Sequence, residues 1–71
     1  MIGFIKVTEK CTNDKVVLNV DRIDYVYEDA ETNEVVILLN VLNSKKRQIF
    51  ITVTDTLYDV NLKIAEAVVR I

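Results

Sequence analysis

Val35-Val36-Ile37-Leu38-Leu39 decides the fold of this chain, because five apolar residues in a row cannot alternate between a dry face and a wet face. A strand that is apolar on both faces is typical of the centre of a sheet that is covered on both sides. The run is far shorter than the roughly 20 residues that cross a bilayer, so we expect no membrane segment. We therefore expect a central strand over residues 34–42.

Four other segments are dense in β-branched and aromatic residues and also predict strands. They are residues 2–8, 15–20, 22–28 and 47–53. In the third of them, Ile23, Tyr25 and Tyr27 occupy alternate positions, which predicts that they share one face of a strand with one buried and one wetter side.

The turns between these strands must be built almost without glycine and proline, because the 71 residues contain no proline and only one glycine. Asn, Asp, Ser and Thr can take their place, since they tolerate left-handed backbone or hydrogen-bond their own main chain. They cluster at Thr12-Asn13-Asp14, at residues 30–33 and at Asn43-Ser44. Asn19-Val20-Asp21 predicts a corner where the chain changes direction.

The C-terminal segment predicts one amphipathic helix. Thr56 and Asp59 have the spacing of a capping box, with Asp55 as a competing cap, and Asp59 precedes Lys63 in the favourable i,i+4 order. At 100° per residue, one apolar stripe should dock on the sheet: Leu57, Val60, Ile64, Val68 and Ile71. A second apolar sector lies beside it: Tyr58, Leu62, Ala65 and Val69.

These elements predict one domain over residues 1–71 of the α+β class. The expected architecture is an antiparallel, strongly curled sheet of four to five strands, followed by one C-terminal amphipathic helix. One helix covers only one face of a sheet, so the other face of the central strand must meet the curled sheet or a second subunit.

A chain this short usually gains stability from a disulfide, a metal or a partner subunit. Cys11 is the only cysteine and histidine is absent, so one copy offers neither a disulfide nor a Cys/His zinc site. We therefore expect a homo-oligomer, with a dimer as the first choice. A lone thiol and an N-terminus without the features of a signal peptide indicate the cytoplasm.

Catalysis is not expected. Without histidine, Cys11 and Ser44 lack the usual base, and one glycine cannot build a phosphate-binding loop, so we predict no catalytic residue, metal or cofactor. The acidic residues around the third strand and its hairpin are interpreted as a solvated edge: Asp21, Asp24, Glu28, Asp29, Glu31 and Glu34.

Lys45, Lys46 and Arg47 are the one concentrated basic feature, at the tip between the fourth and fifth strands. Three cations at a hairpin tip can follow a phosphate backbone, and they can also solvate a turn and protect a strand edge. The formal net charge of −2 argues mildly against non-specific nucleic-acid binding.

The order of these signals resembles the FlbD-like family of small flagella-associated proteins. The resemblance rests on residues 18–26, on a strand ending Ile49-Phe50-Ile51-Thr52-Val53, and on residues 56–60 with Lys63-Ile64. It covers nearly the whole chain. Asn43-Ser44-Lys45 replaces the Asn-Gly of that pattern and Asp21 replaces a common proline, so we carry over the fold alone.

The corner and the hairpin after it also resemble the second half of LytTR DNA-binding domains, in which loops and strand edges approach DNA. That resemblance implies that Lys45, Lys46 and Arg47 occupy the tip that meets phosphate.

We expect a non-catalytic interaction module that self-associates and binds a protein partner through a sheet edge or the helix flank. The residues expected at this interface are Tyr58, Leu62, Val69, Val36 and Leu38. The alternative is a nucleic-acid-binding accessory or transcriptional regulator that uses Lys45, Lys46 and Arg47.

Overall fold

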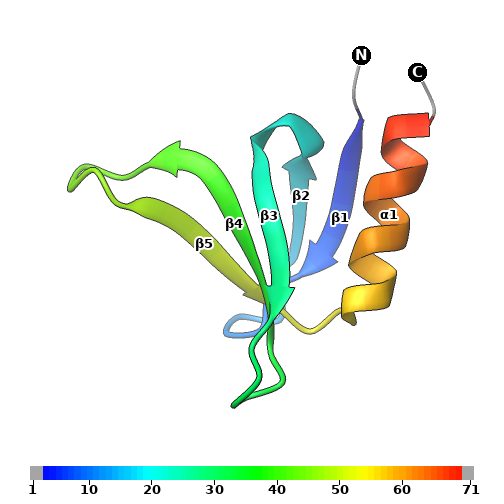
Figure 1. Ribbon diagram of the computed structural model, residues 1–71, viewed down its shortest axis with the longest axis horizontal. Coiled ribbons are helices and arrows are strands. Elements are labelled where there is room, and N and C mark those ends of the chain that lie inside the picture. The colour runs from blue at the N-terminus through cyan, green and yellow to red at the C-terminus, as the bar shows by residue number, and fades with distance from the viewer. Residues whose placement is uncertain (1–2, 70–71) are drawn as a thin grey trace.

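The computed structural model describes residues 3–69, which form five strands, a short 3-10 helix and one α-helix (Figure 1). In chain order these elements are β1 (Phe4–Thr8), β2 (Lys15–Asn19), η1 (Val20–Arg22), β3 (Ile23–Glu28), β4 (Val35–Leu42), β5 (Gln48–Val53) and α1 (Leu57–Val69). The prediction of an α+β fold with antiparallel strands and one C-terminal helix is confirmed. No helix within these residues is long and apolar enough to cross a membrane.

The prediction of a single, strongly curled sheet is wrong, because the strands form two antiparallel sheets: β1–β2, and β3–β4–β5 with β4 in the centre. The sheets meet at a single bridge between Glu9 and Val53, where the Thr54 N–H donates to the Thr8 carbonyl at 2.9 Å. Beyond this bridge β1 runs beside α1, and η1 separates β2 from β3. One continuous sheet therefore cannot form.

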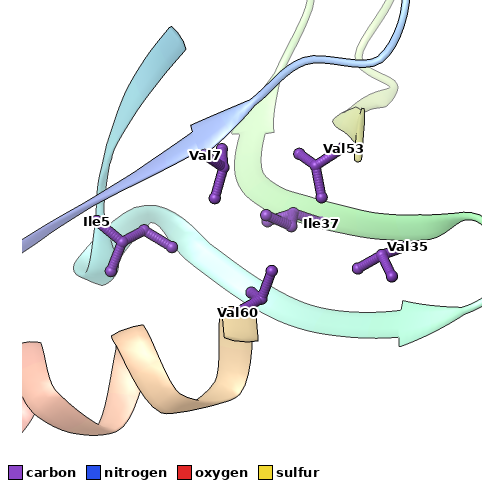
Figure 2. Close-up of a cluster of buried hydrophobic side chains, with 6 residues drawn as sticks. All are labelled: Ile5, Val7, Val35, Ile37, Val53 and Val60. Carbon is purple, nitrogen blue, oxygen red and sulfur yellow. The ribbon is translucent and has the colours of Figure 1, made fainter. Parts of the chain in front are cut away.

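The core lies between the β1–β2 sheet, the inner face of β3–β4–β5 and the start of α1. Figure 2 shows six buried side chains from four elements that point into this space: Ile5, Val7, Val35, Ile37, Val53 and Val60. Ile37 and Val60 are fully buried. Burial of each such side chain stabilises the fold by roughly 1.5–3 kcal/mol. β4 is therefore central, as its sequence predicts.

Two hairpins turn with the same short motif, Thr-Asn followed by an acid. In both, the asparagine adopts left-handed backbone, with φ of 62° at Asn13 and 61° at Asn33. The preceding threonine hydroxyl accepts the N–H of the acid that follows, Asp14 in one turn and Glu34 in the other, at 3.3 Å each. Asn replaces glycine in these turns because it tolerates positive φ better than most residues.

The predicted corner is confirmed as η1. The Asn19 side chain caps it by accepting the Asp21 N–H at 3.0 Å. From β4, the Asn40 side chain donates to the Asp21 carbonyl at 2.8 Å. These two amides fix the direction in which β3 leaves the corner.

Thr56 caps α1, because its hydroxyl accepts the Asp59 N–H at 3.1 Å. Val60 is the deepest residue of the helix, with Leu57 and Ile64 partly buried against the core. Val68 is exposed, contrary to the predicted stripe, and Ala67 packs against the core in its place. Ile71 lies outside the described residues.

Asp55 joins the edge of β1 to α1. One carboxylate oxygen accepts the Thr8 N–H at 2.8 Å, and the other pairs with the Lys63 ammonium at 2.9 Å. Lys63 also donates to the Lys6 carbonyl at 2.7 Å. The expected Lys63 pair with Asp59 is therefore wrong, because the unpaired edge of β1 offers Lys63 a less exposed partner.

The contacts of Asp55 make it sensitive to pH. Partial burial acts to raise the pKa of Asp55, but the Thr8 N–H and the Lys63 ammonium outweigh it and hold that pKa below its ordinary value. A lowered folded-state pKa adds stability that is complete above the unfolded pKa and is lost as the pH falls through the folded one.

We expect Asp55→Asn to lower the free energy of unfolding at pH 7 by about 1–2 kcal/mol, because it removes the ionic partner of Lys63. The difference from the parent chain should begin to shrink as the pH falls below about 4, where Asp55 of the unfolded chain becomes protonated, and should vanish as the pH falls through the lower pKa of folded Asp55. Urea unfolding of both chains at pH 7 and pH 3 measures it. A difference that is the same at both pH values contradicts this role of Asp55.

Candidate interaction surface

A β-bulge reverses the expected orientation of β3. Ile23 pairs with Leu39 but Tyr25 pairs with Leu38, so β3 carries one extra residue at this point. Ile23 and Val26 therefore pack against the core, whereas the two tyrosines point to the other side of the sheet. The expectation that Ile23 shares a face with Tyr25 and Tyr27 is wrong.

The tyrosines begin two rows that cross all three strands of the larger sheet. One row is Tyr25–Leu38–Phe50 and the other is Tyr27–Val36–Thr52. The two tyrosine rings are 5.8 Å apart, centre to centre. We call these six residues the outer face, because they lie on the opposite side of β4 from Val35 and Ile37.

The outer face is largely uncovered. Tyr25 is 53% exposed, Tyr27 39% and Phe50 64%. With roughly 150–250 Å² per aromatic side chain, these fractions leave about 300 Å² of aromatic surface open to solvent. The largest apolar patch on an ordinary monomer measures about 300–600 Å² and often has a function. None of the three aromatic residues belongs to the core cluster within residues 3–69.

The outer face of the β1–β2 sheet has a different character. Phe4 and Val17 are exposed there, but Lys6 and Lys15 alternate with them on the paired strands. Charged side chains among exposed apolar ones are typical of a solvated surface. The face of β3–β4–β5 is thus the better candidate for a contact.

The five residues predicted at an interface fall on two surfaces. Val36 and Leu38 lie on the outer face, although Val36 is only 8% exposed. Tyr58, which is 74% exposed, and Leu62 lie on α1. Because Val60 of α1 packs on the inner side of the sheet, α1 and the outer face lie on opposite sides of β4. The side chain of Val69 is outside the described part of the chain.

Lys45, Lys46 and Arg47 are all exposed at the tip of the β4–β5 hairpin. The Asn43 side chain accepts the N–H groups of Lys45 at 2.8 Å and of Arg47 at 3.1 Å. Lys46 has a φ of 60°, in left-handed backbone. This conformation costs a residue with a side chain about 1–2 kcal/mol. The other two hairpins use Asn at this point, so here a cation stands where Asn or Gly is favoured.

The β3–β4 hairpin carries the opposite charge. Glu28, Asp29 and Glu31 gather there, beside Glu34, which pairs with Lys10. The hydrogen bond from Lys10 is the main reason why the pKa of Glu34 lies below its ordinary value. Figure 1 shows the two hairpins leaving the sheet at opposite ends, β4–β5 at the far left and β3–β4 at the bottom. The outer face thus lies between a basic and an acidic tip.

A groove of about 710 Å³ lies between β1 and α1, and two of its three lysines already have partners: Lys63 contacts Asp55, and Lys15 donates to the Thr8 hydroxyl at 2.7 Å. Cys11 is exposed in the β1–β2 turn. Within residues 3–69, no three acidic or thiol side chains come close enough together to hold a metal ion.

Comparison with known protein families, curated proteins and solved structures finds no match to this chain. The resemblances to the FlbD-like and LytTR families therefore stay predictions, and function must be argued from the surface.

We expect Lys46→Gly to raise the free energy of unfolding by about 0.5–1 kcal/mol, because glycine adopts left-handed backbone without a steric cost. Lys45→Gly is the matched control, since Lys45 is not among the residues with positive φ. It should give no gain. Urea denaturation of the three chains measures both effects. An equal loss in the free energy of unfolding from Lys46→Gly and Lys45→Gly would contradict the strain at Lys46.

Proposed function

We propose that the protein is a non-catalytic interaction module that self-associates and binds a protein partner, and that the outer face of β3–β4–β5 is its binding surface. The observation that carries this proposal is the pair of rows with exposed Tyr25, Tyr27 and Phe50 around Leu38. Tyrosine suits such a surface, because its ring buries well and its hydroxyl stays hydrated while the face is free.

The chemistry of the outer face supports binding to another protein. Its aromatic centre carries no charge, and charged tips flank it, which matches the apolar core and polar rim of protein interfaces. Energetic hot spots in such interfaces are enriched in Tyr, Trp and Arg near the centre. About 300 Å² of aromatic surface is less than half of the roughly 800 Å² per partner of a stable interface. We therefore expect affinities in the micromolar range.

Phe50→Ser is expected to abolish self-association, because it removes the most exposed aromatic ring from the outer face and leaves the core intact. Light scattering coupled to size exclusion, at protein concentrations up to about 1 mM, should show a dimer for the parent chain and the 8.2 kDa monomer for the variant. Circular dichroism verifies that the variant is folded.

Tyr58→Ser is the matched control, because Tyr58 is an even more exposed aromatic residue on the opposite side of the sheet. It should leave the dimer unchanged, as should Leu62→Glu, which tests the helix flank. Dissociation by Leu62→Glu with no effect of Phe50→Ser would transfer the interface to α1. A parent chain that is monomeric throughout would refute self-association.

Binding of single-stranded nucleic acid is a second candidate, favoured by the exposed aromatics beside a basic tip. Bases stack on such rings with about 1–3 kcal/mol each, and cations follow the backbone. The acidic β3–β4 tip opposes it.

This candidate predicts weak binding to an unstructured oligonucleotide that falls with salt and is lost when Lys45, Lys46 and Arg47 are all changed to Ala. Fluorescence anisotropy with a labelled oligonucleotide measures it. Absence of binding in low salt would remove the candidate, and the Phe50→Ser chain tests whether stacking contributes.

A further inference from the structure

We propose that the occupant of the outer face is a second copy of this chain, docked face to face with its strands antiparallel, so that the basic tip of each copy meets the acidic tip of the other. This inference rests on the proposed self-association and adds the geometry of the pair. It follows from the size of the face, the placement of charge and the backbone of Lys46.

The size of the outer face requires contacts beyond its aromatic rings. A three-stranded face with strands about 4.8 Å apart is roughly 14 Å wide, and the eight residues of β4 extend about 26 Å. A footprint this small does not reach the area of a standard interface, so the hairpin tips that project past both ends of the sheet must take part.

The charges of those tips select one alignment. Two stacked sheets keep their strands within about 30° of parallel or antiparallel. A two-fold axis along the strands places Lys45, Lys46 and Arg47 against the same three cations of the other copy. An axis across the strands places them against the acidic tip instead, with Asp29 and Glu31; Glu28 pairs with Val35 and so lies on the inner side of the sheet. Like charges across an interface are strongly unfavourable, so the antiparallel pair is selected.

The three cations, Asp29 and Glu31 have no ion-pair partner within residues 3–69, where the ion pairs are Lys10–Glu34 and Lys63–Asp55. Each end of the pair therefore brings three cations against two anions. An isologous interface repeats the contact at both ends.

The backbone of Lys46 points the same way. Asn or Gly at this position would make the hairpin more stable, and the other two turns have Asn13 and Asn33 with the same left-handed backbone. Stability of the hairpin therefore does not explain the lysine. Local strain is retained in proteins where function requires the residue. A cation at the centre of the tip meets that requirement if the tip faces an acidic partner.

The alignment can be measured as a distance, with a spin label at Ser44→Cys in a Cys11→Ser background. Ser44 lies seven positions beyond Ile37, near the middle of the face, or about 23 Å along the strand. In the antiparallel pair the two labels should be roughly 45–50 Å apart by double electron–electron resonance. In the parallel pair they should be about 10–20 Å apart, since sheets stack about 10 Å apart.

Exchanging charges between the basic and acidic tips tests whether their attraction causes the antiparallel alignment. Lys45→Glu should weaken the dimer about tenfold, and so should Glu31→Lys. Both changes in one chain should restore the affinity to within about threefold. Lys46 and Asp29 stay unchanged, because one has left-handed backbone and the other accepts the N–H groups of Glu31 and Thr32.

The outcomes separate this inference from the proposed function. A long distance together with rescue by the charge exchange supports the antiparallel pair. A dimer that Phe50→Ser dissociates, but whose labels are close together or whose affinity is not restored by the paired charge exchange, overturns the alignment and keeps the module. A parent chain that stays monomeric overturns both.

Discussion

The two-sided apolar character of β4 is the constraint on which the molecule depends. Val35 and Ile37 face the core, and Val36 and Leu38 face the other way, yet the described chain has one helix to cover them. The helix covers the inner side. The outer side is covered only in part, by tyrosine rings from β3 and a phenylalanine from β5. Within residues 3–69 this strand has one full covering layer, and the proposed binding surface lies on its less covered side.

The antiparallel order of β3, β4 and β5 also determines where the charged turns lie. Antiparallel hairpins place consecutive turns at alternate ends of a sheet, so the acidic β3–β4 turn and the basic β4–β5 turn lie a full strand apart. The net charge of the molecule is small, but its larger sheet has an acidic end and a basic end. For the proposed pairing, the apolar face alone does not distinguish the two strand directions, whereas the charge difference between its ends does.

Strand positions, the corner at Asn19 and the Thr56 cap follow from local rules, and the sequence predicts them within a residue or two. The side of the sheet on which each β3 residue lies could not be predicted in this way. A single bulged residue at Asp24–Tyr25 moves both tyrosines away from the side of Ile23, and the alternating pattern of the sequence does not reveal the bulge. The pairing of Lys63 with Asp55 also depends on the edge of β1, because Asp55 is held there by the N–H of Thr8, 47 residues earlier in the chain. The outer face was therefore predicted only through Val36 and Leu38, while its three aromatic residues were missed.

The Asp55 contacts also determine the order in which this fold can assemble. The three hairpins are local in sequence, and without proline no slow isomerisation delays them. The closing contacts are different, because Thr8 must wait for Asp55, and Lys6 for Lys63. During synthesis the N-terminal hairpin therefore stays without these contacts until Asp55 and Lys63 have been made, with the edge of β1 unprotected for that time.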